Sequence, residues 1–208
     1  MGKKASKETK SKIVSAAWKL FYEQGYDNTT VDEIIAESGT SKGSFYHYFD
    51  GKDALLGSLA YLFDETYESL SETIDPQMHS IDVLCYLNRE LFGMIENRID
   101  IDLLTRLYST QLTTKGEKHL LDHNRVYYKL LRQIVLRGQE KGELTKEKSV
   151  NDIVRLYAMA ERALLYDWCL CAGDYSLQAY ASEVMPMFLS SLKVDSRGRT
   201  WCDPVVSD

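Results

Sequence analysis

The sequence predicts an all-α protein, and three observations lead to this prediction. Apolar residues recur three or four positions apart, which is the spacing of one helical face, over most of the chain. Only three prolines and twelve glycines interrupt the 208 residues. Near the N-terminus, two short helical segments meet at a glycine. We therefore expect an N-terminal three-helix unit with a helix-turn-helix, joined by one long helix to a larger helical C-terminal half.

The two short helices have recognisable start and stop signals. Thr30 and Glu33 form a capping box, in which each side chain satisfies a free amide of the other, so a helix starts after Thr30. Gly39 ends this helix because glycine adopts the left-handed conformation at little cost, and Thr40 or Ser41 caps the next one. Helix, glycine turn, helix is the unit whose second helix enters the major groove of DNA. An ordinary helical hairpin with a polar surface is the alternative.

The outer face of the second helix favours DNA. It carries small hydroxyls, one cation and two amphipathic rings, without a carboxylate. A glycine inside a helix costs roughly 0.5–1 kcal/mol relative to alanine, so we expect the glycine on this face to permit the close approach of a partner backbone. The residues of this face are Ser41, Lys42, Gly43, Ser44, Tyr46 and His47.

Motifs on both sides of this segment make a family resemblance specific. They are Ile13-Val14-Ser15-Ala16-Ala17-Trp18-Lys19-Leu20-Phe21, Gly25-Tyr26, Thr29-Thr30-Val31, Gly39-Thr40-Ser41, Gly43-Ser44-Phe45-Tyr46-His47-Tyr48-Phe49 and Lys52-Asp53-Ala54-Leu55. With these motifs, about a quarter of the chain resembles the N-terminal DNA-binding domain of TetR-family transcriptional regulators.

The resemblance implies a homodimer whose N-terminal helices bind operator DNA and whose C-terminal helices dimerise and bind an inducer. It places the DNA-binding domain at 8–68, with the helix-turn-helix at 31–49 and a linking helix from 53, and the ligand-binding and dimerisation domain at 69–208. By position in the motif, it implies that Thr30, Tyr48 and Lys52 hold phosphates, while the outer face of the second helix reads the groove.

The charge distribution agrees with a DNA-binding N-terminus. Residues 1–52 hold eight lysines and seven acidic residues, a net charge of +1. Because the net charge of the whole chain is −6, residues 53–208 carry a net charge of −7. The lysines near the N-terminus attract phosphate or, alternatively, form a solvated tail. No apolar run approaches the roughly 18 residues that span a bilayer, and the start lacks the apolar segment of a signal peptide. We expect a cytoplasmic protein without a membrane partner.

Metal and catalytic chemistry find little support in the sequence. His119 and His123 are four residues apart and could share a metal on a helix, but a solvated face is the simpler interpretation, and no metal or cofactor is predicted. The four cysteines are expected to be reduced. No nucleophile, base and orienting group stand at recognisable spacings. An enzyme on a helical scaffold is therefore the least favoured function.

The remaining helices follow from apolar periodicity. After a flexible start to about Ser6, the first helix runs to Gln24, and the linking helix runs without interruption to about Thr73. Further helices are predicted at 81–98, 101–111, 115–141, 150–172 and 177–193. A polar tail covers 195–208.

The last two helices have apolar faces wider than one neighbour covers, which predicts pairing with a second copy of the chain through Tyr157, Leu164, Val184 and Phe188. Aromatic residues of the C-terminal half could line a cavity for an apolar or aromatic ligand, or pack in the core. Glu161 could meet a cationic inducer or pair with Arg155 or Arg162 across the dimer. Residues assigned to this ligand site are Tyr61, Tyr86, Tyr108, Tyr127, Glu161 and Trp168.

Two regulatory hypotheses remain open from the sequence. In the first, a homodimeric repressor leaves a palindromic operator when a small apolar or aromatic inducer binds. In the second, a protein partner controls the same DNA-binding domain without a small ligand.

Overall fold

A computed structural model describes residues 2–113 and 118–194, without the side chains of residues 2–5 and 7. The predicted polar tail from Asp195, with Cys202, lies outside this part of the chain. Every regular element in it is helical, apart from an isolated bridge between Leu144 and Lys193, and the all-α prediction is confirmed. Contacts divide the chain into unit 1, residues up to 61 with 102–120, and unit 2, residues 62–101 with those from 121 onward. The sequence did not predict that residues 102–120 group with the N-terminal helices.

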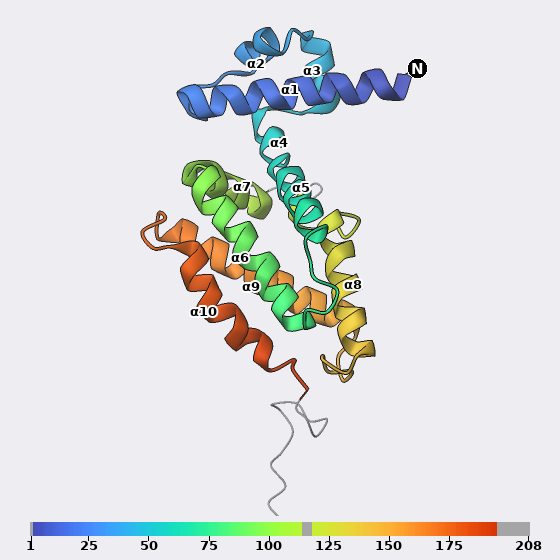
Figure 1. Ribbon diagram of the computed structural model, residues 1–208. Coiled ribbons are helices and arrows are strands. Elements are labelled where there is room, and N and C mark those ends of the chain that lie inside the picture. The colour runs from blue at the N-terminus through green and yellow to red at the C-terminus, as the bar shows by residue number, and fades with distance from the viewer. Residues whose placement is uncertain (1, 114–117, 195–208) are drawn as a thin grey trace, which may run out of the picture. The chain divides into compact units, whose positions relative to one another are not determined.

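Unit 1 contains the three N-terminal helices, α4 (Lys52–Leu56), the start of α5 (Leu59–Ser71) and nearly all of α7. Helix α1 spans Gly2–Gln24, α2 spans Val31–Ser38, α3 spans Lys42–Tyr48, and α7 spans Ile101–Thr113. Helices α2 and α3 pack against α1 (Figure 1). Fully buried apolar side chains fill the space between these three helices, since they come from all of them: Ile13, Ala17, Ile34 and Phe45. The predicted end of the first helix is confirmed, but it starts at Gly2 and not after Ser6.

The local signals that frame the helix-turn-helix act as predicted. Glu33 N donates to Thr30 Oγ1 at 3.2 Å, and Thr30 N donates to Glu33 Oε2 at 2.7 Å, which completes the capping box. Gly39 lies in the left-handed region at φ 61° and donates to carbonyls of the last turn of α2. Ser41 caps α3 by accepting a hydrogen bond from Ser44 N at 3.0 Å. Local residues therefore determine where these helices begin and end.

The prediction of one uninterrupted linking helix is wrong. The chain forms α4, Lys52–Leu56, and then α5, Leu59–Ser71, with a turn at Gly57 and Ser58. Ser58 Oγ accepts from Trp18 Nε1 at 2.7 Å and donates to Leu55 O at 2.5 Å. The serine hydroxyl thus takes up a backbone carbonyl that would otherwise accept a helical hydrogen bond. The imidazole of His119 also fills the space that a Cβ on Gly57 would occupy. The break is accompanied by contacts with residues distant in sequence, which the apolar periodicity of the helix does not indicate.

Unit 2 is built on four helices. They are α6, Ser80–Arg98; α8, Val126–Glu140; α9, Val150–Leu170; and α10, Leu177–Ser190. Helix α10 packs on α6 and α9, and α8 packs on the same two helices (Figure 1). None of the helices in the described ranges combines the length and apolarity needed to cross a bilayer.

The predicted helix over 115–141 is confirmed from Val126 to Glu140, but its predicted start is wrong. Residues 114–117 are not described, a short 3₁₀ helix, η1, spans His119–Leu121, and α8 begins only at Val126. Asp122 Oδ1 accepts from Asn124 N at 2.9 Å, a local turn that competes with helix. His119 and His123 therefore do not share a helix face, and the geometric basis for a common metal is lost.

Candidate functional site

The outward face of α3 is the candidate nucleic-acid interface. Phe45 points into the core and is fully buried, while Lys42, Tyr46 and His47 are exposed on the other side. A 7-residue helix that buries one aromatic ring can leave most of its polar side chains accessible. The structure brings all six predicted groove-facing residues onto α3 or its N-cap, with Ser44 half-buried.

Gly43 has no role inside the free protein that would require glycine. Its φ is not in the left-handed region, and a Cβ there would meet only Ser41 Oγ, at 3.9 Å. This distance is an ordinary van der Waals contact. The missing side chain therefore leaves open surface on α3, which is consistent with close approach by a partner.

Lys42 is available to such a partner. Its Nζ lies 3.2 Å from Asp32 Oδ1, and both side chains are mostly exposed. Exposed ion pairs contribute about 0–1 kcal/mol. Lys42 can exchange Asp32 for another acceptor at little cost.

The three residues predicted to hold phosphates all have partners within unit 1. The Thr30 hydroxyl belongs to the capping box, and Tyr48 OH donates to Ser6 Oγ at 2.9 Å. Lys52 Nζ donates to the carbonyl oxygens of Tyr26 at 2.7 Å and Thr29 at 2.8 Å. Lys52 thus holds the turn that precedes α2, a role that the sequence did not indicate. Their contacts with phosphate stay predictions.

Tyr26 is the centre of this turn. Two cations lie near its ring, with Lys52 Nζ 4.4 Å and Arg106 Cζ 4.9 Å from the centroid. Its hydroxyl donates to Asp53, and Arg106 forms an ion pair with Asp27. Burial, followed by the Asp53 contacts, raises the pKa of the Tyr26 phenol. Arg106, on α7, thereby fixes the approach to the helix-turn-helix, and no local sequence signal could have placed it there.

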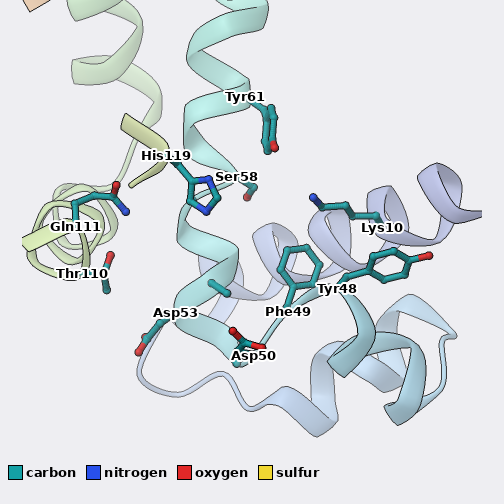
Figure 2. Close-up of a pocket in the computed structure, with 13 residues that line it drawn as sticks. Lys10, Tyr48, Phe49, Asp50, Asp53, Ser58, Tyr61, Thr110, Gln111 and His119 are labelled. Carbon is teal, nitrogen blue, oxygen red and sulfur yellow. The ribbon is translucent and has the colours of Figure 1, made fainter. Parts of the chain in front are cut away.

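A cavity of about 540 Å³ lies beside the α4–α5 break in unit 1 (Figure 2). Lys10 Nζ lies 5.6 Å from the Phe49 ring centroid and 5.8 Å from that of Tyr61, and Ser58 and His119 also line the cavity. Tyr61, assigned from sequence to the ligand site, therefore lines this cavity, where 54% of its surface is exposed.

Glu161 and Tyr127 meet in a second candidate site inside unit 2. Tyr127 OH donates to Glu161 Oε2 at 2.5 Å, Tyr67 OH to Oε1 at 3.2 Å, and Asn88 Nδ2 to Oε1 at 3.0 Å. Glu161 is buried within one chain, and its described partners there are neutral. Its pairing with Arg155 or Arg162 across a dimer stays a prediction. Within one chain, Arg162 donates to Tyr128 OH.

The other predicted ligand-site residues do not join this cluster. The half-buried Tyr86 shares a hydrogen bond with Thr73, and Trp168 Nε1 donates to Tyr175 O at 2.9 Å. Tyr108 belongs to α7 in unit 1. Asn88 and Tyr67 were missed because an asparagine and one of 14 tyrosines carry no distinguishing signal.

The exposed apolar surface of the last two helices differs from the predicted one. Tyr157 is fully buried and Leu164 is 8% exposed, because both face the core of unit 2. Val184 and Phe188 are half-buried. Large apolar side chains that remain exposed on these helices are Met159, Tyr166 and Leu170 on α9 and Tyr180 and Met187 on α10.

The helix-turn-helix with its polar outer face, carried on an all-helical chain, defines a class of DNA-binding proteins. Comparison with known proteins gives the family. Residues 13–59 match the family described as bacterial regulatory proteins, tetR family. The transcriptional regulator TtgR of Pseudomonas putida is 27% identical over 188 residues, which cover 84% of this chain and 87% of TtgR. The predicted resemblance to TetR-family transcriptional regulators is confirmed: the N-terminal part of the chain matches the tetR-family domain, and relatives over most of its length are transcriptional regulators.

Solved structures share the fold over nearly the whole chain. FadR of Thermus thermophilus, a repressor in complex with lauroyl-CoA, superposes with a TM-score of 0.67 at 24% identity and covers 93% of this chain and 98% of its own. FadR of Bacillus subtilis in complex with stearoyl-CoA has a TM-score of 0.65 at 21% identity, with 86% and 97% covered. At these identities the similarity concerns the fold.

Proposed function

We propose that this protein is a homodimeric repressor that binds a palindromic operator through α3 and leaves it when a small molecule occupies unit 2. The observation that carries the proposal is the accessible, carboxylate-free face of α3, with Gly43 open to close approach. Backbone contacts would position the helix, and side chains such as Lys42 would read base edges.

Dimerisation is supported by the exposed apolar side chains of α9. Met159, Tyr166 and Leu170 recur at helical spacings of seven and four residues, so they form one stripe. Leu170 is 66% exposed, and such a stripe has no partner among the described residues of its own chain. A second copy would cover it and would also supply the second reading helix that a palindrome requires.

Control by a small molecule is supported by two findings. Relatives in fold hold acyl-CoA, and Glu161 forms a buried polar cluster where α5, α6, α8 and α9 meet. Because the cluster includes Tyr67 of α5, a ligand there would act on the helix that follows α4 in the chain. Its effect on operator affinity equals its differential binding to the two states, typically about 1–3 kcal/mol.

The test begins with selection of DNA from a random pool by the purified full-length protein. We expect enrichment of a sequence with two inverted half-sites, whose centres lie about one helical turn or a multiple of it apart. Binding to this DNA, followed by fluorescence anisotropy, should have a stoichiometry of two chains per site and be lost when one half-site is scrambled. Enrichment of no sequence, or full affinity for a single half-site, would contradict the proposal.

A further inference from the structure

Glu161 is a buried carboxylate without a cation. It is 4% exposed, and the hydroxyls of Tyr67 and Tyr127 and the amide of Asn88 donate to it. The hydroxyl of Tyr157, which donates to Leu84 O, also lies beside it, and all four groups are neutral. No ion pair in the described ranges includes Glu161. Removing an ionised carboxylate from water is expensive unless a counter-charge and hydrogen bonds replace the lost hydration. The residues around Glu161 supply these hydrogen bonds, but none of them supplies a positive charge.

Asp64 shows how unit 2 treats its other buried carboxylate. Asp64 is 7% exposed and lies 2.9 Å from Arg125, which donates to both carboxylate oxygens. Two buried acids in one core thus have different environments, one with a cation and one without. Consistent with this difference, burial raises the pKa of Glu161 although its hydrogen bonds act in the opposite direction.

A second, independent observation points to a missing donor. Asn88 is 1% exposed, and its amide nitrogen donates to Glu161 Oε1, but its Oδ1 has no hydrogen-bond partner. An unsatisfied buried acceptor is destabilising, because it has lost its hydrogen bonds to water without replacement. The same amide therefore brings an unused acceptor beside the carboxylate. The rings of two tyrosines beside Glu161 pack against each other, with the centroids of Tyr67 and Tyr127 4.9 Å apart.

We propose that the site formed by Glu161, Asn88, Tyr67 and Tyr127 binds the protonated nitrogen of an organic amine that carries an apolar body. This inference rests on the proposed function and specifies the chemical class of its ligand. The ammonium supplies the counter-charge of Glu161 and an N–H for Asn88 Oδ1. The tyrosine rings add cation–π attraction, which is stronger at a desolvated site than at an exposed one.

The same chemistry disfavours other ligand classes at this site. An anion would face the Glu161 carboxylate at low dielectric, and a neutral apolar molecule would leave both the carboxylate and Asn88 Oδ1 unpaired. The acyl-CoA held by relatives in fold carries phosphates, so we expect this protein to differ from them in ligand charge.

Entry of an ammonium also provides a route to the DNA-binding helices. The hydroxyl of Tyr67 or Tyr127 now occupies an oxygen of Glu161, and it must move aside for the ligand. Tyr67 lies on α5, which begins directly after the turn at Gly57 and Ser58. Displacement of Tyr67 therefore acts on the helix that follows the α4–α5 break.

The experiment compares two probes of similar shape and different charge, 4-phenylbutylamine and 4-phenylbutanol, by calorimetric titration of the full-length protein at pH 7. We expect the amine to bind wild-type protein at least tenfold more tightly than the alcohol. Glu161→Gln, which keeps an acceptor for the tyrosines, should reduce amine affinity at least tenfold and change alcohol affinity less than twofold. Glu183→Gln, at an exposed position on α10, is the matched control and should behave as wild type.

Several outcomes would overturn the ligand class. These are an amine that does not bind wild-type protein, an alcohol or lauroyl-CoA that binds it more tightly than the amine, and an amine affinity unchanged in a folded Glu161→Gln protein. The comparison of probes on wild-type protein decides the question even if that variant does not fold. Operator binding without ligand tests the proposed function separately. Amine binding that leaves operator affinity unchanged would confirm the site and contradict induction.

Discussion

Gly39 and Gly43 of the helix-turn-helix are glycines for different physical reasons, and substitution by alanine distinguishes the two. Gly39 is in the left-handed conformation, where an L-residue costs about 1–2 kcal/mol. Gly43 has ordinary helical geometry and open space beside it. We predict that Gly39→Ala lowers the free energy of unfolding in urea by about 1 kcal/mol or more, whereas Gly43→Ala raises it by about 0.5–1 kcal/mol. Gly43→Ala should nevertheless weaken operator binding, and unchanged affinity would remove Gly43 from the interface.

Lys42 and Lys52 also differ, since only one of them supports the fold. Lys52 Nζ holds two backbone carbonyls of the turn before α2, while the ion pair of Lys42 is exposed. We predict that Lys52→Ala lowers both the melting temperature and the affinity for all DNA sequences. Lys42→Ala should leave the melting temperature unchanged and reduce discrimination between operator and random DNA, by roughly 1–3 kcal/mol if the lysine meets a guanine. Equal effects on both DNAs would assign Lys42 to phosphate.

At the scale of elements, the sequence predicted what local signals control. The capping box of Thr30 and the C-cap of Gly39 set helix ends to the residue, because their partners lie within a few positions. The break at Gly57 and Ser58 was not predictable in this way. It involves Trp18 and His119, which are distant in sequence, and helical periodicity continues through it.

The candidate sites divide in the same manner. The outer face of α3 follows from helical periodicity once Phe45 is placed inward. The clusters around Tyr26 and Glu161 depend on Arg106 and on Asn88 with Tyr67, which other helices supply. A sequence shows that Glu161 stands on an apolar helix face, but only packing shows which groups surround it.

The exposed stripe of α9 gives a prediction for this helix as an interface. Met159→Glu places a charge among apolar side chains that a second copy would bury, so the variant should be monomeric. Sedimentation velocity of Met159→Glu and of Leu112→Glu separates interface from general exposure, because Leu112 is 70% exposed on α7. Leu112→Glu should remain dimeric. A dimer of Met159→Glu with wild-type stability would place the interface elsewhere.

At the scale of the whole molecule, charge is distributed unevenly along the chain. Residues 53–208 carry −7 and residues 1–52 carry +1. We therefore expect the N-terminal lysines to attract phosphate and the acidic remainder to repel it, which would orient the approach to DNA. Glu161 is one of the acidic residues of 53–208, but it is almost fully buried. Its ionisation therefore affects the free energy of unfolding more than it affects the electrostatic field at the surface.

The last prediction concerns the pH dependence of global stability, which Glu161 should influence with a definite sign. Burial raises the pKa of its carboxyl above the ordinary value of 4.5. The native state therefore binds more protons than the unfolded chain between pH 4.5 and the native pKa, and the contribution of Glu161 to stability falls as pH rises through this window. We expect the unfolding free energy of wild type minus that of Glu161→Gln to decrease from pH 4 to pH 8, at no more than about 1.4 kcal/mol per pH unit. The same difference for Glu183→Gln, measured by urea unfolding in the same buffers, should stay nearly constant because that side chain is exposed.

The tyrosines around Glu161 do not disturb the measurement, since burial raises the pKa of Tyr67, Tyr127 and Tyr157 above their usual 10.0. A difference that increases with pH would show that the native cluster stabilises the Glu161 anion without a ligand, and the need for an external counter-charge would disappear.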